Sequence, residues 1–369
     1  MAASSRLAFV TSKLDAIAST KTPHAATTTN LMPLNSQLET PQLWAQPLFA
    51  SFGRPPVNKI SPSSAAKILW QLRPHLANSH AEIVKNTTNG KFIGVDLGGT
   101  NVRAGLIYRN KIVALEKNPT FGSADADRVV EEICKTIAAV FRPGISGIGV
   151  GVPSIVDLKK GIVFSANNIP SWHMVPLKKI LERRFRVPVI VNNDANCFAL
   201  GEFHHGQARG CQNVVGIICG TGLGSGVVLN GRLYSGTNCG AGEICNIPYR
   251  EKDLEHYCSG RFFQREFGVD ALTAEQRADA GDAGARKMFA AFAEHFANMI
   301  LTVLYAYDPE MIVLGGGVSR AFRHFQEPLW EKLRAEFHFK HSLKRLKIVA
   351  SKKPHIAVLA AAALCLDSD

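Results

Sequence analysis

Short apolar runs separated by glycine-rich turns occupy the chain from residue 91 onward, in two similar series. The first series predicts strands at 92–95, 104–107, 112–116, 145–152 and 187–191, and the second at 214–218, 226–229, 232–234 and 311–314. Apolar residues at helical spacing predict helices at 125–141, 177–185, 195–202, 284–306 and 356–366. A strand meander, a helix, a strand and a helix thus occur twice, which predicts an α/β fold of two related halves with a ligand between them.

Three glycine-rich segments follow predicted strands, at 96–103, 220–226 and 315–317, and the pair Asn193-Asp194 lies between the first two. Glycine lets backbone N–H groups approach phosphate oxygens closely, so such loops suggest a bound nucleotide. Neither of the first two segments is a Walker A loop, because no Gly-Lys-Ser/Thr follows. One such loop alone is more often a tight turn, but the order of all three favours a nucleotide cleft.

This order of motifs resembles the ROK family (repressor, open reading frame, kinase) of sugar kinases over roughly residues 91–363. The most specific pieces are 96–103, 193–196, 220–226, 240–243 and 315–318. The resemblance implies a two-domain α/β fold of the actin-like ATPase (ribonuclease H-like) type, with the active-site cleft between the domains. The expected parts are an N-terminal extension at 1–90, a first domain at 91–193 plus 353–369, and a second domain at 194–352.

The resemblance implies phosphoryl transfer from ATP, with Mg²⁺, to a hexose hydroxyl, and the 6-position of glucose is the leading acceptor. Other hexoses, including an N-acetylhexosamine, stay open. Asp194 is the expected general base, because a carboxylate at a strand end can accept the hydroxyl proton. The alternative is that Asp194 only caps the following helix. Asp96 is expected to hold Mg²⁺ through water or phosphate.

The remaining candidates fall into two groups. Those expected to bind the nucleotide lie in the glycine loops: Asp96, Gly98, Gly99, Thr100, Arg103, Thr221, Gly222, Gly316 and Gly317. Those expected to contact the sugar are Asn193, Glu243, Asn246, Glu255, Asn168 and Ser154. The simpler alternatives are a surface ion pair for Arg103, a helix-opening turn for the last two glycines, and a solvated charge for each glutamate.

The chain departs from the family where many members hold a structural zinc. Asn246 stands at the usual His position, and the Cys-rich loop is missing between Ile247 and Leu254. No zinc site is therefore expected. Because the family's His also contacts the sugar, the family's usual sugar preference does not carry over directly to this chain. The eight cysteines form no Cys-x-x-Cys pair, which fits free thiols in a reducing, cytoplasmic setting.

Composition excludes few functions. Hydrophobic residues make up 46% and charged residues 20%, and no apolar run is expected to cross a bilayer. The net charge of +12 is not confined to the N-terminal residues. We expect a small sugar, ATP and a second copy of the chain as partners, and neither a membrane nor nucleic acid.

The N-terminal residues leave a second function open, a sugar-responsive repressor of the same family. The segment 61–72 resembles a DNA-recognition helix, but Gly53-Arg54-Pro55-Pro56 interrupts the helix that should precede it. A repressor also has no need of all the phosphate loops, so the kinase ranks first. Residues 1–60 fit an organelle-targeting peptide, a disordered extension or an upstream start codon equally well.

Overall fold

The computed structural model describes residues 90–166 and 169–366. The chain divides into two units, Met1–Gln71 and Leu72–Asp369, and all described residues lie in the second. The predictions for residues 1–89, including the helix at 61–72, lie outside the described residues, and so does Asn168.

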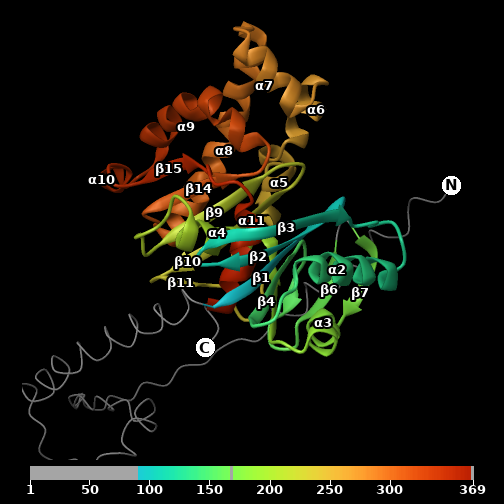
Figure 1. The fold of residues 1–369 in the computed structure, drawn as a ribbon. Helices are drawn as coiled ribbons and strands as arrows, with labels where there is room; N and C mark the ends of the chain where they lie inside the picture. Colours follow the sequence, from blue (N-terminus) through green and yellow to red (C-terminus); the bar gives the residue numbers. More distant parts are fainter. Residues whose placement is uncertain (1–89, 167–168, 367–369) are drawn as a thin grey trace, which may run out of the picture. The chain divides into compact units, whose positions relative to one another are not determined.

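The first half is built on a five-stranded sheet in the order β3-β2-β1-β4-β8 (Figure 1). Its strands are β1 (Lys91–Leu97), β2 (Asn101–Tyr108), β3 (Lys111–Pro119), β4 (Ile145–Val152) and β8 (Val189–Asn193). The first three form an antiparallel meander, and β1, β4 and β8 run parallel. Helices α2 (Ala126–Val140) and α3 (Leu177–Phe185) lie close to the predicted positions. A small sheet of β5 (Val156–Asp157), β6 (Ile162–Ala166) and β7 (Ile169–Val175) was not predicted.

The second half repeats this topology in the order β11-β10-β9-β14-β15. Its strands are β9 (Val214–Cys219), β10 (Leu223–Leu229), β11 (Arg232–Leu233), β14 (Met311–Gly315) and β15 (Lys347–Ala350). Strand β10 begins three residues earlier than predicted, because Gly224 and Gly226 pair with β9 and belong to the sheet. Only Gly220–Gly222 remains as the turn. The predicted α/β class with two related halves is confirmed.

The helices of the second half form its core with one face of the sheet. They are α5 (Leu254–Cys258), α6 (Arg261–Phe267), α7 (Ala271–Asp279), α8 (Ala283–Tyr307), α9 (Phe322–Glu336) and α10 (Lys340–Leu343), with short 3-10 turns η3 (Ile244–Asn246) and η4 (Val318–Ala321) and the hairpin β12 (Pro248–Tyr249) and β13 (Lys252–Asp253). Within the described residues, α8 alone is long and apolar enough to cross a membrane. The expectation that no segment would be was therefore wrong by length and composition. Phe289, Phe292 and Phe296 of α8 are nevertheless fully buried, so the helix belongs to the core.

Two helices join the halves by packing on the sheets and on each other. Helix α4 (Asp194–His205) contacts β9 and β10, while α11 (Ile356–Ala363), followed by η5 (Leu364–Leu366), contacts β1 and β4. The two helices approach the sheets so closely that the strand residues facing them must be glycine. A Cβ atom at Gly94 would lie 1.9 Å from the Val358 carbonyl oxygen, and one at Gly226 would lie 2.4 Å from that of Ala195. Several glycines of the motifs thus serve helix packing and not ligand binding.

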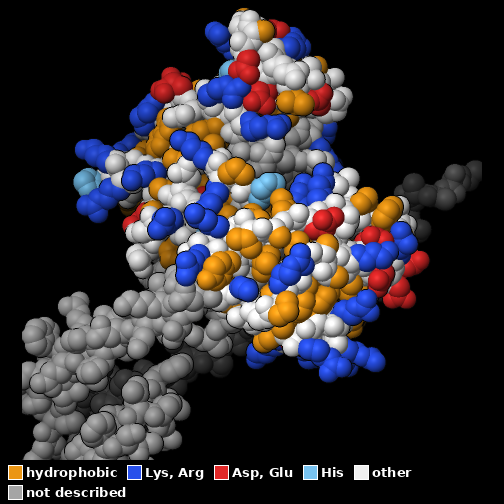
Figure 2. All heavy atoms as spheres, viewed as in Figure 1, with side chains coloured by type: hydrophobic (Ala, Val, Ile, Leu, Met, Phe, Trp, Pro, Cys, Tyr) orange, Lys and Arg blue, Asp and Glu red, His pale blue; other side chains and the backbone are white. Residues whose placement is uncertain are grey.

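Positive charge gathers on the folded surface around α10 and β15. No Asp or Glu occurs from residue 337 to 366. Lys340, Lys344, Arg345 and Lys347 are exposed there. Figure 2 shows Lys and Arg side chains with a His at the left, where Figure 1 places these elements. The net charge is therefore partly a property of this surface.

Candidate active site

The carboxylates of Asp96 and Asp194 lie at the same edge of the first sheet. Asp96 in β1 is in register with Gly151 of the neighbouring parallel strand β4. Next along the sheet, Asn193 ends β8 and Asp194 begins α4. A Cβ atom at Gly151 would lie 3.6 Å from the Asp194 Cα, so no side chain separates the two acids there. This edge is the carboxyl end of the parallel strands, where α/β proteins commonly bind ligands.

The pKa of Asp194 is raised from 3.8 to about 7. Burial is the main cause, and the negative charges of Asp96 and Glu243 add to it. The Ala195 N–H donates to Asp194 Oδ1 at 2.8 Å and opposes the rise. The carboxyl group can therefore exchange a proton near neutral pH, which suits a general base.

Asn193, and not Asp194, caps helix α4. The Asn193 Oδ1 accepts the N–H groups of Ala195 at 2.8 Å and Asn196 at 3.2 Å. Its Nδ2 donates to the Ser154 carbonyl oxygen at 3.3 Å. The alternative that Asp194 caps the helix is therefore wrong, because Asn193 occupies the N-cap position. With both amide atoms engaged, the sugar contact of Asn193 stays a prediction.

Arg103 pairs with Asp96 across the β1–β2 ladder. The two residues are direct cross-strand partners, and Arg103 Nη1 lies 3.0 Å from Asp96 Oδ2. Burial raises the pKa of Asp96 even though Arg103 lowers it. The ion-pair alternative for Arg103 is thus observed, but its partner is the carboxylate expected to act at the metal. The pair holds both groups at the strand end.

The first glycine loop is a tight turn between β1 and β2. The Gly98 N–H donates to the Asn101 carbonyl oxygen at 3.0 Å. Thr120 braces the turn from outside, because its hydroxyl donates to the Gly98 carbonyl at 2.6 Å and its N–H to that of Thr100 at 2.9 Å. Gly99 and Thr100 lie at its tip, where Thr100 is exposed. Thr120 carries no sequence signal, since only the fold brings it to this turn.

Thr221 and Gly317 line one pocket of about 330 Å³. It lies in the second half, where the β9–β10 turn meets η4 and the starts of α6 and α7. The lining residues that the sequence analysis missed include Arg261, Gln264, Leu272 and Arg320. Their motif signal is absent, because they come from helix starts without glycine patterns. The pocket is large enough for part of a nucleotide.

Gly222 and Gly316 do not line this pocket. Gly316 has φ +81°, and a Cβ atom there would lie 2.3 Å from the Cys219 carbonyl oxygen. The Ser319 hydroxyl donates to the Gly316 carbonyl at 2.7 Å. Gly316 therefore serves the turn that opens the following helix, as the simpler alternative predicted. Gly317 instead faces open space and lines the pocket.

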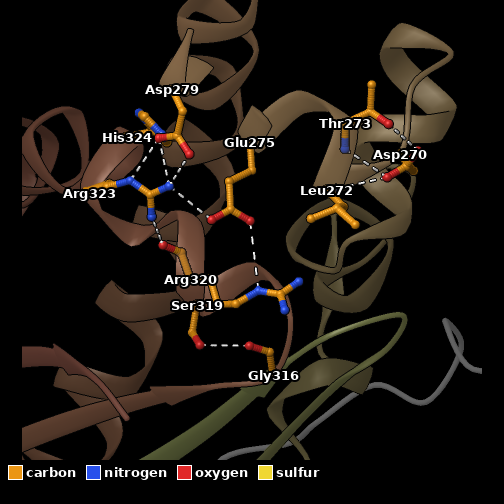
Figure 3. A network of polar contacts seen from close by, with 10 residues as sticks. All are labelled: Asp270, Leu272, Thr273, Glu275, Asp279, Gly316, Ser319, Arg320, Arg323 and His324. Atoms are coloured by element: carbon orange, nitrogen blue, oxygen red, sulfur yellow. Dashed lines mark hydrogen bonds and ion pairs between the residues drawn. The ribbon is translucent and has the colours of Figure 1, made fainter. Parts of the chain in front are cut away.

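A charged network holds the two walls of the pocket together (Figure 3). Glu275 of α7 lies 3.1 Å from Arg323 Nη2 and 3.9 Å from Arg320 Nε. Arg323 also pairs with Asp279 at 2.6 Å, and His324 lies 2.7 Å from the same carboxylate. The Glu275 side chain is only 11% exposed, so it is nearly enclosed by its partners. The network joins α7 to η4 and α9.

The candidate sugar residues of the second half lie together. The Asn246 Nδ2 donates to Glu243 Oε2 at 3.1 Å, and the Cys245 thiol lies 3.4 Å from the same oxygen. Burial, followed by the negative charges of Glu243 and Glu255, raises the pKa of Cys245 to about 12. Helix α5, which carries Glu255, contacts η3. Ser154 lies in the first half, with its hydroxyl donating to carbonyl groups of Ile155 and Ser165.

A buried polar cluster behind Asp194 was missed by the sequence analysis. The Asn192 Oδ1 accepts from Asn196 Nδ2 at 3.1 Å and from the Cys239 thiol at 3.4 Å. The Asn192 Nδ2 donates to the Ser235 hydroxyl at 3.3 Å. Ser235 and Cys239 belong to the second half, so the cluster ties their loop to the end of β8. Of the residues in this cluster, only Asn196 belongs to a sequence motif, Asn193-Asp194-Ala195-Asn196.

The end of β1 offers one carboxylate, which fits a magnesium ion whose remaining ligands are water and phosphate. Asp96 supplies one carboxylate, with 18% of its side chain exposed. Mg²⁺ commonly takes one or two protein carboxylates and completes its shell with water and phosphate. Among residues 90–166 and 169–366, no group of three or more His, Cys, Asp or Glu side chains could hold a metal by itself.

Comparison with known proteins gives concordant matches. The sequence model of the ROK family matches residues 92–368. The glucokinase of Thermotoga maritima is 31% identical over 275 residues, which cover 66% of this chain and 87% of that enzyme. The N-acetyl-D-glucosamine kinase of Aliivibrio salmonicida is 31% identical over 261 residues, covering 62% and 84% respectively.

A solved structure supports the same assignment. The ROK family glucokinase from Streptomyces griseus, in complex with glucose and AMPPNP, has a TM-score of 0.65 and 27% identity to this chain. The match covers 74% of this chain and 99% of that one. With the family motifs distributed over both sheets and the family match spanning both halves, the chain belongs to the ROK family and has the actin-like ATPase fold of its sugar kinases.

Proposed function

We propose that this chain phosphorylates a hexose hydroxyl with ATP, and that Asp194 is the general base. The observation that carries the proposal is the Asp194 carboxyl group, which lies at the start of α4 with its pKa raised to about 7. A base with a pKa near the working pH combines a usable carboxylate population with a strong pull on the proton. Family membership supplies the reaction class.

The chain's residues would divide the reaction as follows. Asp194 would accept the proton of the sugar hydroxyl as the hydroxyl oxygen bonds to the γ-phosphorus, while the bond from that phosphorus to the β–γ bridging oxygen breaks and ADP leaves. The N–H groups at 99–100 and 221–222, in the two glycine turns, would bind phosphate oxygens, because those of Gly98 and Gly220 already donate within their turns. Asp96 would hold Mg²⁺ through water or phosphate, and the ion would supply positive charge against the phosphates. Arg103 keeps the Asp96 carboxylate in place and adds a positive charge beside it.

The nucleoside would occupy the pocket lined by Thr221 and Gly317. Leu272 is 49% exposed and lines the same pocket, so it offers an apolar surface for a base. Arg261 and Arg320 supply positive charge around it. Gly222 and Gly316 would contribute indirectly, because each lets neighbouring backbone or side chains approach closely.

The sugar would be bound by Glu243 and Glu255, since a carboxylate can accept hydrogen bonds from two neighbouring hydroxyl groups. Asn246 is hydrogen-bonded to Glu243 and exposed, so it can reach a further hydroxyl. Asn193, Ser154 and Asn168 complete the proposed set. Glucose leads among the substrates, and an N-acetylhexosamine follows, because the relatives include kinases for both.

We further propose a cytoplasmic dimer that requires no structural zinc. None of the eight cysteines forms a disulfide in the described residues and six of them are buried, which suits a reducing compartment. The domain boundaries proposed from the sequence are supported by α11, which packs on β1 and β4 of the first sheet although it lies near the end of the described residues.

A coupled assay with MgATP and a panel of hexoses tests the function. We expect turnover with glucose or an N-acetylhexosamine, and a loss of roughly 10²–10⁴-fold in kcat for Asp194→Asn with nucleotide binding retained. A variant that keeps more than about a tenth of kcat would show that Asp194 is not the base. Absence of phosphorylated product with every hexose would refute the proposed activity.

A further inference from the structure

The β9–β10 turn is held from one side by a single segment, residues 255–260. The Leu223 N–H donates to Glu255 Oε2 at 3.2 Å. The Gly260 N–H donates to the Gly220 carbonyl oxygen at 2.7 Å. The Cys219 thiol donates to the Cys258 carbonyl oxygen at 3.0 Å. The turn that carries Thr221 therefore depends on the position of this segment.

The turn and the segment are in close contact, which leaves no room for a Cβ atom at Gly260 and only a tight fit for one at Gly222. A Cβ atom at Gly260 would lie 2.7 Å from the Gly220 carbonyl oxygen. A Cβ atom at Gly222 would lie 3.2 Å from Glu255 Oε2 and 3.9 Å from Oε1. In contrast, a Cβ atom at Gly220 would meet nothing within 4 Å. A shift of the Glu255 carboxylate toward Gly222 would therefore displace the turn, and a shift away would break the hydrogen bond from the Leu223 N–H.

The same carboxylate belongs to the candidate sugar cluster. Helix α5, which carries Glu255, contacts the η3 turn that begins after Glu243. The Leu254 N–H donates to the Ile247 carbonyl oxygen at 3.0 Å, which fixes the start of α5 beside η3. A carboxylate has about four lone-pair positions, so Glu255 can hold the Leu223 N–H and a sugar hydroxyl at the same time.

We propose that Glu255 is a positioning residue that couples the two substrate sites: a sugar bound to its carboxylate fixes the β9–β10 turn for the nucleotide. This inference rests on the proposed sugar kinase function. Without sugar, the carboxylate is held only by the single N–H of Leu223 among its described contacts. A hydroxyl donor restricts its rotation, so the turn is ordered before the nucleotide binds. Coupling between sites must be reciprocal, because it is a free energy shared by both.

Titration calorimetry with glucose and a non-hydrolysable ATP analogue measures this coupling without turnover. For the wild type we expect each ligand to lower the Kd of the other by the same factor, about tenfold. In Glu255→Ala that factor should fall toward one. N-acetylglucosamine replaces glucose as the probe if the activity panel selects it.

Two glycine substitutions in the same turn provide a matched pair. Gly222→Ala places a methyl group against the Glu255 carboxylate, so it should weaken sugar binding several-fold and reduce the coupling factor, although it lies in the nucleotide turn. Gly220→Ala meets open space, so sugar binding should stay within about twofold of wild type. These variants test the proposal even if Glu255→Ala does not fold.

The outcomes separate the inference from the function. Wild-type protein that binds both ligands and forms product, but with a coupling factor of one, would overturn the role of Glu255 and leave the kinase proposal standing. Equal effects of Gly222→Ala and Gly220→Ala on sugar binding would also overturn it. If no hexose binds and none is phosphorylated, the proposed function itself fails.

Discussion

Replacing Asp194 by Asn should stabilise the folded protein at neutral and alkaline pH while it removes turnover. A folded-state pKa of about 7, against 3.8 for the unfolded chain, means that the native site prefers the neutral acid. The protonated carboxyl group adds to the free energy of unfolding in full below pH 3.8, and this addition is lost as the pH rises to about 7. Above that, the wild type retains a buried charge that asparagine lacks.

The size of the effect follows from the same two values. A pKa displaced from 3.8 to about 7 corresponds to roughly 4 kcal/mol of unfolding free energy. Partial exposure of Asp194 to solvent reduces this, so we expect a gain of about 2–4 kcal/mol at pH 8 and almost none at about pH 4. Asparagine can still accept the Ala195 N–H, so the local hydrogen bond is not lost.

Urea unfolding followed by tryptophan fluorescence over this pH range measures the gain. Asp127→Asn is the matched control, because Asp127 also lies in the first turn of a helix, α2, but is exposed. Its substitution should change the free energy of unfolding by less than about 1 kcal/mol, because the side chain is exposed. An Asp194→Asn variant no more stable than wild type at pH 8, or a gain that does not grow with pH, would refute the burial argument.

The remaining predictions concern pH, the nucleotide pocket and the packing of the halves. The kcat/KM for sugar should fall about tenfold per pH unit below about 7, since protonated Asp194 cannot accept a proton, and a flat profile would exclude it as the base. Glu275→Gln should raise the KM for ATP about tenfold and leave that for sugar unchanged, because it removes the negative charge beside Arg320, which lines the pocket; steady-state kinetics with each substrate varied would detect the opposite pattern. Gly226→Ala should lower the free energy of unfolding by about 1–3 kcal/mol in urea titrations, because its methyl group meets the α4 backbone, whereas Gly240→Ala, which meets nothing within 4 Å, should change it little.

Local signals in the sequence determined the elements and the reaction class. Apolar periodicity located β4 and α3 at their observed bounds. The dipeptide Asn230-Gly231 is typical of a type I′ hairpin turn, and its φ angles of 53° and 75° agree with that turn. Such features depend on neighbouring residues, so one sequence suffices to read them. The order of the motifs along the chain identified the family, because that order can be read without knowing how far apart the motifs lie in space.

The tertiary structure decided which residues of those motifs meet. Glycine looks the same in a sequence whether it approaches a phosphate or a helix, so only the packing of α4 on β10 revealed the role of Gly226. The pocket residues Arg261 and Arg320 come from separate elements and share no periodic pattern. The raised pKa of Asp194 likewise depends on burial and on two charges distant in sequence, Asp96 and Glu243. Chemistry that arises from long-range contacts becomes visible only when the chain is folded, because spacing along the chain does not determine distance in space.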